Sequence, residues 1–578
     1  MDPCSGSVSL PLERLPFNNT ALRRLPVDDS EAAGSRTVPG ACFSRIRTLQ
    51  PLLRPTFVAV SASALALLGL SGREVLSAPL GPDYLSGSRL LPGSEPAAHC
   101  YSGHQFGLFA GQLGDGAALY LGEVEGPGGQ GRWEIQVKGA GVTPYSRFGS
   151  FEIFLGRDEF SGLQGPSAGR HDVRAQLLDY VIESFYPSIQ RRHSNRKERN
   201  TAFFREVAMR TAKLVAQWQS VGFCHGVLNT DNMSILGLTL DYGPFGFMDR
   251  FDPDFVCNAS DRRGRYSYRA QPSVCRWNLA RLAEALGSEL HGAEAGAVLD
   301  DFMPAYEAFY LGNMRRKLGL LRREEAEDGE LVSDLLRLMH NTGADFTNTF
   351  RLLSRVPWPA EGDRERSAVG AVVDAILDQC ADIEELKRFG EKAYQDNIEL
   401  AMILSMAQTN PVMFGMVADR PEVSQQLERM GRLKELLATD QAELREKQRD
   451  DWIHWVGRYR SRLARECDGA SDPCAVREAR LSAMNSTNPR VVLRNYIAQN
   501  AIQAAERGDF SEVHRILEVL ENPYSDAPGA EPQDGSDGRS SENQKDREPK
   551  CEGETDYKQL TVGYGSKPPA WARGICVT

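Results

Sequence analysis

Residues 225–246 read HGVLNTDNMSILGLTLDYGPFG, and they decide the fold more than any other stretch of the chain. A polar loop ends in Asp231 and Asn232, a hairpin-like run follows, and that run ends in Asp241. A carboxylate and an amide oxygen are hard ligands, which suit Mg²⁺ when phosphate oxygens and waters complete its coordination. The alternative interpretation is a polar turn in which His225 is structural and the Asp-Asn pair is a cap.

The spacing of these residues matches the catalytic loop of protein kinases. Kinases place a metal-holding asparagine seven residues after a histidine, and an Asp-Phe-Gly triplet follows the next hairpin. Here His225 and Asn232 keep that spacing, and Asp241 opens the triplet Asp-Tyr-Gly. The position of the kinase catalytic aspartate holds Val227, whose side chain cannot accept a proton. The stretch therefore retains the metal-holding parts of a kinase, while the carboxylate of its loop is displaced to Asp231.

Upstream features could contact a nucleotide. Gly114 and Gly116 lie in a tight turn before the strand-like run ALYLGEV, and such glycines let backbone amides approach a phosphate. Lys138 ends the strand-like run RWEIQVK, as the phosphate-pairing lysine of kinases ends a strand. Arg147 and Arg170 carry guanidinium forks that suit phosphate. Each has an ordinary alternative: a hairpin turn for the glycines, a solvated strand end for the lysine and a surface position for the arginines.

The composition excludes several classes of protein. There are 67 Lys and Arg against 78 Asp and Glu, and the net charge of −11 argues against nucleic-acid binding. No apolar run spans a bilayer; the longest, residues 57–70, is broken by serines and predicts a buried helix. The 11 cysteines are scattered without a CxxC motif, which favours a reducing compartment. The N-terminus shows neither a secretory signal nor an evident mitochondrial presequence.

The texture of the sequence changes along the chain. Residues 1–95 are rich in Pro, Gly and Ser with one helical run near 57–72, and residues 96–147 carry β-prone runs typical of hairpins. From residue 171 apolar residues recur at helical spacing, and residues 275–520 are mostly helical. We therefore expect an N-terminal extension (1–95), a kinase-like nucleotide-binding domain (96–340), a helical C-terminal region (341–523), a disordered acidic linker (524–557) and a tail that docks back (558–578).

Long segments of the chain match one known family in the family's own order. They include YSGHQFGLFAGQLGDGAALYLGEV, EIQVKGAGVTPYSR, RFGSFEIF, QLLDYVI, HGVLNTDNMSILGLTLDYGPFGFMD and NPRVVLRNYIAQNAIQAAERGDF, spread over residues 40–523. In these segments the chain resembles the selenoprotein O family, and its tail resembles the vertebrate mitochondrial form. The resemblance implies an α+β, protein-kinase-like fold with two lobes, a mostly helical C-terminal region and a mitochondrial location.

The resemblance also implies a reaction, that of a protein adenylyltransferase which binds ATP in an inverted orientation. AMP moves from ATP to the hydroxyl of a Ser, Thr or Tyr side chain of a protein substrate, with Mg²⁺ (or Mn²⁺) as cofactor. An inverted nucleotide removes the need for an aspartate at Val227. The implied roles are Asp231 as proton acceptor, Asn232 and Asp241 as metal ligands, and Gly114, Gly116, Ala117, Lys138, Arg147 and Asp241 as contacts to the nucleotide.

Two departures from the family bear on activity. In the family several dozen residues separate PYSR from RFGSFEIF, and they include the helix whose glutamate pairs with the lysine. Here the two motifs share Arg147, so we expect an N-terminal lobe that is incomplete at residues 147/148 and a Lys138 without its usual partner. The family tail continues to a selenocysteine, whereas this chain ends soon after Cys576. That leaves either a free thiol or a redox link through this cysteine.

Three functions stay open at this point. Protein AMPylation follows from the family. A catalytically dead ATP-binding pseudokinase follows from the missing helix. A kinase that transfers the γ-phosphate follows from the motif spacing, although Val227 argues against it. The oligomeric state and the protein substrates stay open as well.

Overall fold

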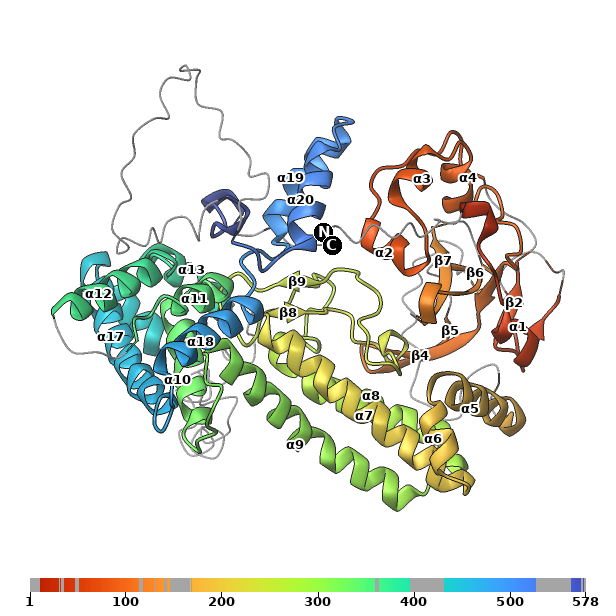
Figure 1. Cartoon of the computed structure of the whole chain (residues 1–578), viewed down its shortest axis with the longest axis horizontal. Helices are drawn as coiled ribbons and strands as arrows, with labels where there is room; N and C mark the ends of the chain where they lie inside the picture. Colours follow the sequence, from red (N-terminus) through yellow and green to blue (C-terminus); the bar gives the residue numbers. More distant parts are fainter. Residues whose placement is uncertain are drawn as a thin grey trace, which may run out of the picture.

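The structure is a computed structural model of the chain. It describes residues 11–30, 32, 36–46, 51–113, 118–129, 131–139, 143–145, 167, 169–358, 363–395, 431–526, 563–572 and 575. Small sheets lie in the N-terminal part and helices make up most of the rest, so the predicted α+β class is confirmed (Figure 1). The N-terminal sheet and the described helices between residues 328 and 487 lie at opposite ends of the molecule, and long helices run between them along one side (Figure 1).

A five-stranded sheet organises the N-terminal part. Its order is β1 (Val27–Asp28), β2 (Phe43–Arg45), β3 (Ala97–His99), β6 (Ala118–Glu125) and β7 (Arg132–Lys138). β1 pairs parallel with β2 and the other neighbours are antiparallel, so strands from both sides of residue 95 share one sheet.

A bulge in β6 shapes the packing of this sheet. The pairing register shifts between Tyr120 and Gly122. Gly122 has a φ of +143°, and a Cβ on it would lie 2.1 Å from Asn19 Oδ1. Only glycine fits that position. Because of the shift, Leu119 before the bulge and Val124 after it both pack into one core cluster.

Among the described residues of the first 95 there are four short α-helices, where the sequence predicts one helical run near residues 57–72. They are α1 (Thr20–Arg24), α2 (Ala62–Leu67), α3 (Gly72–Ser77) and α4 (Gly81–Leu85). The predicted buried helix over residues 57–70 is wrong, because α2 has 6 residues and none of them is buried. Ser61 caps the start of α2 through its hydroxyl, and Gly69, with a φ of +74°, follows its end.

The hairpins predicted for residues 96–147 are confirmed in the described residues. β6 and β7 form one, and β4 (Tyr101–Gln105) and β5 (Leu108–Leu113) form the other. The turn between β4 and β5 consists of Phe106 and Gly107, with φ of +51° and +85°. Two successive residues with positive φ are typical of the two-residue turn that suits the twist of a hairpin.

The helices predicted from residue 171 onward are confirmed. They are α5 (His171–Phe185), α6 (Pro187–Arg192), α7 (Arg196–Ser220), α8 (Gln271–Leu286) and α9 (Gly292–Lys317). Asn195 caps α7 by accepting hydrogen bonds from the amides of Lys197 and Glu198. Phe204 and Ala208 recur at helical spacing on α7, are fully buried and pack into a cluster shared with α8 and α9. These three helices run side by side (Figure 1).

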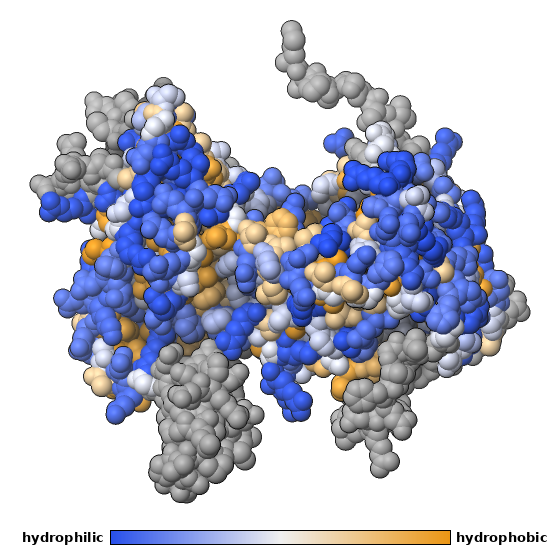
Figure 2. Space-filling model, turned by 90° about the horizontal axis from the view of Figure 1, so that it is seen from below, coloured by the Kyte–Doolittle hydropathy of each residue, from blue (hydrophilic) through white to orange (hydrophobic). Residues whose placement is uncertain are grey.

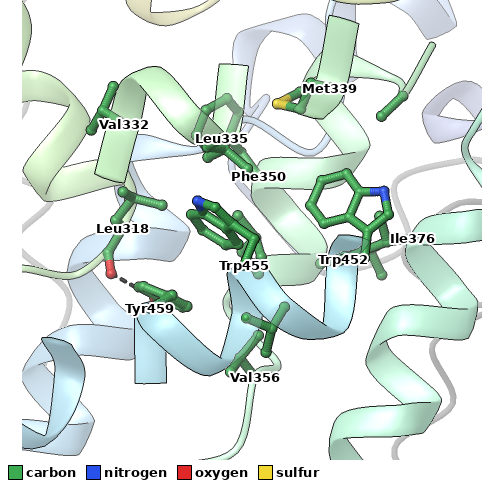
Figure 3. Packing of buried hydrophobic residues seen from close by; sticks show 14 of the residues in the cluster. Leu318, Val332, Leu335, Met339, Phe350, Val356, Ile376, Trp452, Trp455 and Tyr459 are labelled. Atoms are coloured by element: carbon green, nitrogen blue, oxygen red, sulfur yellow. Dashed lines mark hydrogen bonds between the residues drawn. The ribbon is translucent and has the colours of Figure 1, made fainter. Parts of the chain in front are cut away.

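The C-terminal region is helical in its described part, as predicted. Its helices are α10 (Asp328–Thr342), α11 (Phe346–Leu353), α12 (Asp363–Asp378), α13 (Ile383–Gln395), α17 (Gln441–Glu466), α18 (Pro473–Thr487), α19 (Asn495–Glu506) and α20 (Ser511–Glu521). Three aromatic residues of α17, Trp452, Trp455 and Tyr459, fill the centre of this core (Figure 3). Tyr459 satisfies its hydroxyl by donating to the Leu318 carbonyl at 2.7 Å (Figure 3).

A buried arginine joins this helical region to the stretch that follows Asp241. The Arg494 side chain is 1% exposed, and its guanidinium lies 2.8 Å from carboxylate oxygens of both Asp249 and Asp345. Asp345 is the N-cap of α11 and also accepts from the amide of Asn348. The segment after Asp241 is therefore held from the C-terminal side of the molecule.

The tail docks back onto the body of the protein, as predicted. Tyr564 is buried, and its hydroxyl donates to Glu512 at 2.8 Å. The Gly565 carbonyl accepts from Asn348 Nδ2 at 2.9 Å. Of the predicted disordered linker, only residues 524–526 belong to the described residues, and Cys576 lies outside them. The disorder and the redox role therefore stay predictions.

Among the described helices, none is long and apolar enough to cross a membrane. On the face shown in Figure 2, hydrophobic residues form separate patches among hydrophilic ones, without a continuous apolar band.

Candidate active site

The two ends of the stretch 225–246 are brought together by a short sheet. β8 (Phe223–Cys224) pairs antiparallel with β9 (Gly246–Phe247). Between them the predicted hairpin reduces to a single bridge between Met233 and Thr239. Gly226 makes the first turn with a φ of +79°, where a Cβ would lie 2.6 Å from Cys257 Sγ and 2.9 Å from the Pro244 carbonyl. A glycine is therefore required directly after the histidine.

His225 has a structural role. Its side chain is 1% exposed, and Nε2 donates to the Leu240 carbonyl at 2.8 Å, while its backbone amide donates to Gln271 Oε1 at 2.9 Å. Burial lowers the pKa of His225, so the imidazole is neutral near pH 7. The ring fixes the residue directly before Asp241 against the start of the loop.

Asn232 and Asp241 are in direct contact. Asn232, the last residue of the short helix η3 (Thr230–Asn232), donates through Nδ2 to Asp241 Oδ2 at 3.1 Å and to the Val227 carbonyl at 2.8 Å. Both amide hydrogens are used in this way, which leaves the amide oxygen as the group that can bind a cation. Asp241 has a φ of +56°, a conformation that is uncommon without glycine and concentrates at functional sites.

Lys138 joins these two residues from the N-terminal sheet. Its Nζ lies 3.2 Å from Asp241 Oδ1, and the two side chains are 72% and 38% exposed. Lys138 is the last residue of β7 and lies opposite Ala118, the first residue of β6. An ion pair this exposed contributes little to the stability of the fold. A phosphate can therefore replace Asp241 as the partner of Lys138 with little loss of stability. The structure thus brings together three predicted site residues, Lys138, Asn232 and Asp241.

Asp231 lies on the side of the loop that faces strand β4. A Cβ on Gly103 would lie 3.1 Å from Asp231 Oδ1 and 2.8 Å from Thr230 Oγ1. The amide of His104 donates to that Thr230 hydroxyl at 2.7 Å. The backbone of β4 therefore packs directly against the loop that carries Asp231.

A second contact between the hairpin and the loop runs through Tyr266. This residue is 1% exposed, and its hydroxyl donates to Asn229 Oδ1 at 2.7 Å and accepts from the Phe106 amide at 2.7 Å. Burial raises the pKa of Tyr266, so the hydroxyl keeps its proton. Sequence reasoning missed Gly103, Asn229 and Tyr266, because the contacts between the hairpin and the loop residues span more than a hundred positions.

The other predicted site residues are not among these contacts. Gly114, Gly116, Ala117 and Arg147 lie outside the described residues, so their roles stay predictions. Arg170 forms a bidentate ion pair on the surface with Asp172, at 2.9 and 2.7 Å.

The contacts among Lys138, Asn232 and Asp241 lie within a chain that matches a known family. The family model described as Protein adenylyltransferase SelO matches residues 52–156 and 166–521. The chain belongs to the SelO family. The resemblance stated from the sequence is therefore confirmed, and with it the assignment to a family of protein adenylyltransferases.

Individual relatives agree with this assignment. Protein adenylyltransferase SelO-1, mitochondrial, from Danio rerio is 53% identical over 652 residues, covering 98% of this chain and 94% of the relative. Protein adenylyltransferase SelO, mitochondrial, from Homo sapiens is 46% identical over 662 residues, covering 99% of this chain and 95% of the relative. Protein nucleotidyltransferase YdiU from Bordetella avium is 36% identical over 613 residues, covering 96% of this chain and 98% of the relative. The predicted mitochondrial location is confirmed at the level of the family.

The alignments also bear on the predicted missing segment. Those with the two vertebrate relatives extend over 652 and 662 positions, more than the 578 residues of this chain. These relatives therefore carry residues that this SelO-family chain lacks. The predicted junction between residues 147 and 148 lies outside the described residues.

Proposed function

We propose that this chain is a protein adenylyltransferase that moves AMP from ATP to the hydroxyl of a Ser, Thr or Tyr side chain of a protein substrate. The observation that carries the proposal is the convergence of Lys138 and Asn232 on Asp241, in a member of the SelO family. The three side chains supply a cation for phosphate and two hard oxygen ligands, which an enzyme that handles ATP needs.

The fold that we propose around this site is a kinase-like one with two lobes, in which strands β1 and β2 extend the predicted range of residues 96–340 on its N-terminal side. The sheet that ends in Lys138 would form the N-terminal lobe, and helices α7 to α9 with the loop of Asp231 would form the other. Residues 341–523 would make a separate helical region. Support comes from the position of the site, which lies where the strand β7 and the loop before Met233 meet.

In the proposed reaction the acceptor oxygen attacks the α-phosphorus of ATP. A new phosphorus–oxygen bond forms, the bond from that phosphorus to the bridging oxygen breaks, and pyrophosphate leaves. Asp231 would accept the proton of the hydroxyl, a task that a nearby carboxylate can perform. Lys138 would bind the phosphates. Val227 fits this assignment, because no carboxylate is then needed at that position.

Asn232 and Asp241 would hold Mg²⁺ or Mn²⁺. The donor set fits such an ion, since Asp241 offers a carboxylate and Asn232 has its amide oxygen left over once both of its hydrogens are engaged. When bound, the cation would neutralise charge on the phosphates of ATP.

A second candidate is an ATP-binding pseudokinase that transfers nothing. In active kinases a glutamate from a helix orients the lysine. Here the carboxylate that meets Lys138 is that of Asp241 itself, the proposed metal ligand.

One experiment separates these functions. The purified chain is incubated with Mg²⁺ and ATP labelled at either the α- or the γ-phosphate, beside Asn232→Ala and Asp241→Ala. Asp301→Ala serves as the matched control, because this carboxylate pairs with Arg205 on the surface of α9. We expect label on protein from α-labelled ATP only, a loss of about 100-fold or more in both site variants, and no loss in the control. Transfer of the γ-label would instead identify a kinase, and ATP binding without any transfer would identify the pseudokinase.

A further inference from the structure

The turn of the β4–β5 hairpin exposes apolar side chains. Phe106 is 43% exposed, Leu108 is 73% exposed and Phe109 is 37% exposed. Phe106 also has a φ of +51°, in the left-handed region that residues with a side chain rarely adopt. The Phe106 ring packs against that of Tyr266, with centroids 5.3 Å apart, yet much of the side chain stays exposed at this strained turn, which points to a role outside the fold itself.

A basic loop lies next to this turn. Arg262 and Arg263 are exposed, and with Arg265 they form the sequence DRRGR at 261–265. Within the described part of the chain, no ion pair joins these three arginines to a carboxylate. The carboxylate of Asp261 is hydrogen-bonded to the backbone, because its oxygens accept from the amides of Arg265 at 3.0 Å and Tyr266 at 2.7 Å. In a chain with a net charge of −11, this loop is a local concentration of positive charge.

The turn and the loop form one continuous surface. A Cβ on Gly107 would lie 2.9 Å from the guanidinium carbon of Arg265, which therefore packs against the turn. The same guanidinium lies over the ring of Trp277, 4.7 Å from its centroid, and the His104 ring lies 5.4 Å from that of Trp277. We call this the hairpin–arginine surface; its members are Phe106, Leu108, Phe109, Arg262, Arg263, Arg265 and Trp277.

This surface begins beside the proposed proton acceptor. Gly103, on the same hairpin, packs against Asp231, and the amide of Phe106 is bonded to Tyr266. A polypeptide that lies across the turn would therefore bring its own side chains next to the loop of Asp231. Apolar contacts at the turn would hold it, and the arginines would attract carboxylates in it.

We propose that the hairpin–arginine surface binds the acceptor protein, through a segment in which acidic and apolar residues flank the hydroxyl that receives AMP. This inference rests on the proposed function and adds to it the class of substrate. Arg262 and Arg263 select acidic residues, and Leu108 and the two phenylalanines select apolar ones. Because the arginines are exposed, binding weakens as the salt concentration rises.

The test measures binding without ATP, so that it does not depend on transfer. The probes are three fluorescein-labelled peptides of about 15 residues, each with a central serine, long enough to cross such a surface. One has aspartates and leucines around the serine, one has lysines in place of the aspartates, and one has serines in place of the leucines. Fluorescence anisotropy gives the affinity of each peptide for the whole chain.

We expect the peptide with aspartates and leucines to bind at least about tenfold more tightly than the other two. Leu108→Ser and the double variant Arg262→Glu/Arg263→Glu should each lose at least about tenfold in affinity for it. The controls are Leu53→Ser, at a leucine that is 98% exposed, and Arg191→Glu/Arg192→Glu, at two exposed arginines; these variants change residues elsewhere and should bind the peptide normally.

Three outcomes would overturn the proposal. They are no preference for this peptide, equal binding by the surface and control variants, and a wild-type dimer that these variants convert to a monomer, which would make a second copy the occupant. The α-label assay with the same peptides tests the proposed function separately. Selective binding without transfer would sustain the surface and refute the transferase, whereas transfer unaffected by the variants would do the reverse.

Discussion

Tyr266 carries a contact on which the loop around Asp231 depends. The substitution Tyr266→Phe keeps the ring but removes the hydroxyl that bonds to Asn229 and to the Phe106 amide. We expect the free energy of unfolding to fall by about 1 kcal/mol, because Asn229 Oδ1 and the Phe106 amide lose the hydroxyl but keep their own hydrogen bond at 3.4 Å. We expect AMP transfer to fall about tenfold or more at unchanged affinity for ATP, since a catalytic group that shifts slightly is costly.

Urea unfolding and transfer from α-labelled ATP measure these two effects. Tyr524→Phe is the matched control, because this tyrosine is 42% exposed. Full activity of Tyr266→Phe would mean that the loop holds its geometry without the hairpin.

Lys317 is buried among apolar residues, with its Nζ 4.0 Å from the centroid of the Phe350 ring. Burial lowers the pKa of Lys317 from 10.5 to about 7. Between pH 7 and pH 10.5 the unfolded chain binds a proton at Lys317 that the folded protein does not. The contribution of Lys317 to the free energy of unfolding therefore rises with pH over this range, and it is least favourable below pH 7. We expect Lys317→Met to be more stable than the wild type by about 4 kcal/mol at pH 7 and by only about 1 kcal/mol at pH 9.5.

Urea unfolding of both proteins at the two pH values measures this difference. An advantage that does not change with pH would mean that Lys317 titrates as an ordinary lysine in the folded protein.

At the scale of elements, the β4–β5 hairpin couples the N-terminal sheet to the loop of Asp231. Gly103→Ala places a methyl group 2.8 Å from Thr230 Oγ1 and 3.1 Å from Asp231 Oδ1, so the strand and the loop must move apart. We expect AMP transfer to fall about tenfold or more while ATP binding stays unchanged. The control is Gly296→Ala in α9, where nothing lies within 4 Å of the new methyl group. Equal transfer by the two variants would contradict a tight contact at β4.

Elements with their own periodicity could be predicted from the sequence. Helices such as α7 and α17 and the hairpin β6–β7 follow from the spacing of apolar residues and from turn residues. β1 and β2 could not, because strands of 2 and 3 residues have no pattern of their own; β1 exists through pairing with β2, and β2 through pairing with β3. The predicted buried helix failed because Ser61 and Gly69 limit α2 to 6 residues.

In the candidate site, too, only residues that belong to a local motif could be predicted. Lys138, Asn232 and Asp241 could be named because their spacing is that of a known motif. Gly103 and Tyr266 act through contacts that the fold creates, and the bond from Phe106 to Tyr266 joins residues 160 positions apart. No local signal marks such a pair.

At the scale of the whole molecule, Arg494 ties the C-terminal region to the segment after Asp241. Arg494→Met leaves Asp249 and Asp345 without their guanidinium partner. We expect a loss of about 3–5 kcal/mol in the free energy of unfolding, since breaking a buried ion pair strands the opposite charge.

The double variant Arg494→Met/Asp249→Asn tests whether this loss comes from the unpaired charge of Asp249. Burial raises the pKa of Asp249 while Arg494 opposes that rise, so removing both charges should recover part of the lost stability in urea unfolding. A double variant that loses the sum of the two single effects would mean that the charges do not interact.

The exposed pair of Lys138 and Asp241 has a consequence for how ligands enter. A phosphate that draws Lys138 away leaves the Asp241 carboxylate with one cationic neighbour fewer, which makes it a stronger ligand for a divalent cation. A cation on Asp241 in turn releases Lys138 for phosphate. Phosphate binding at Lys138 and cation binding at Asp241 therefore favour each other. Thermodynamic reciprocity requires each ligand to raise the affinity for the other by the same factor. Under the proposed assignment, nucleotide and cation therefore bind this site more tightly together than either does alone.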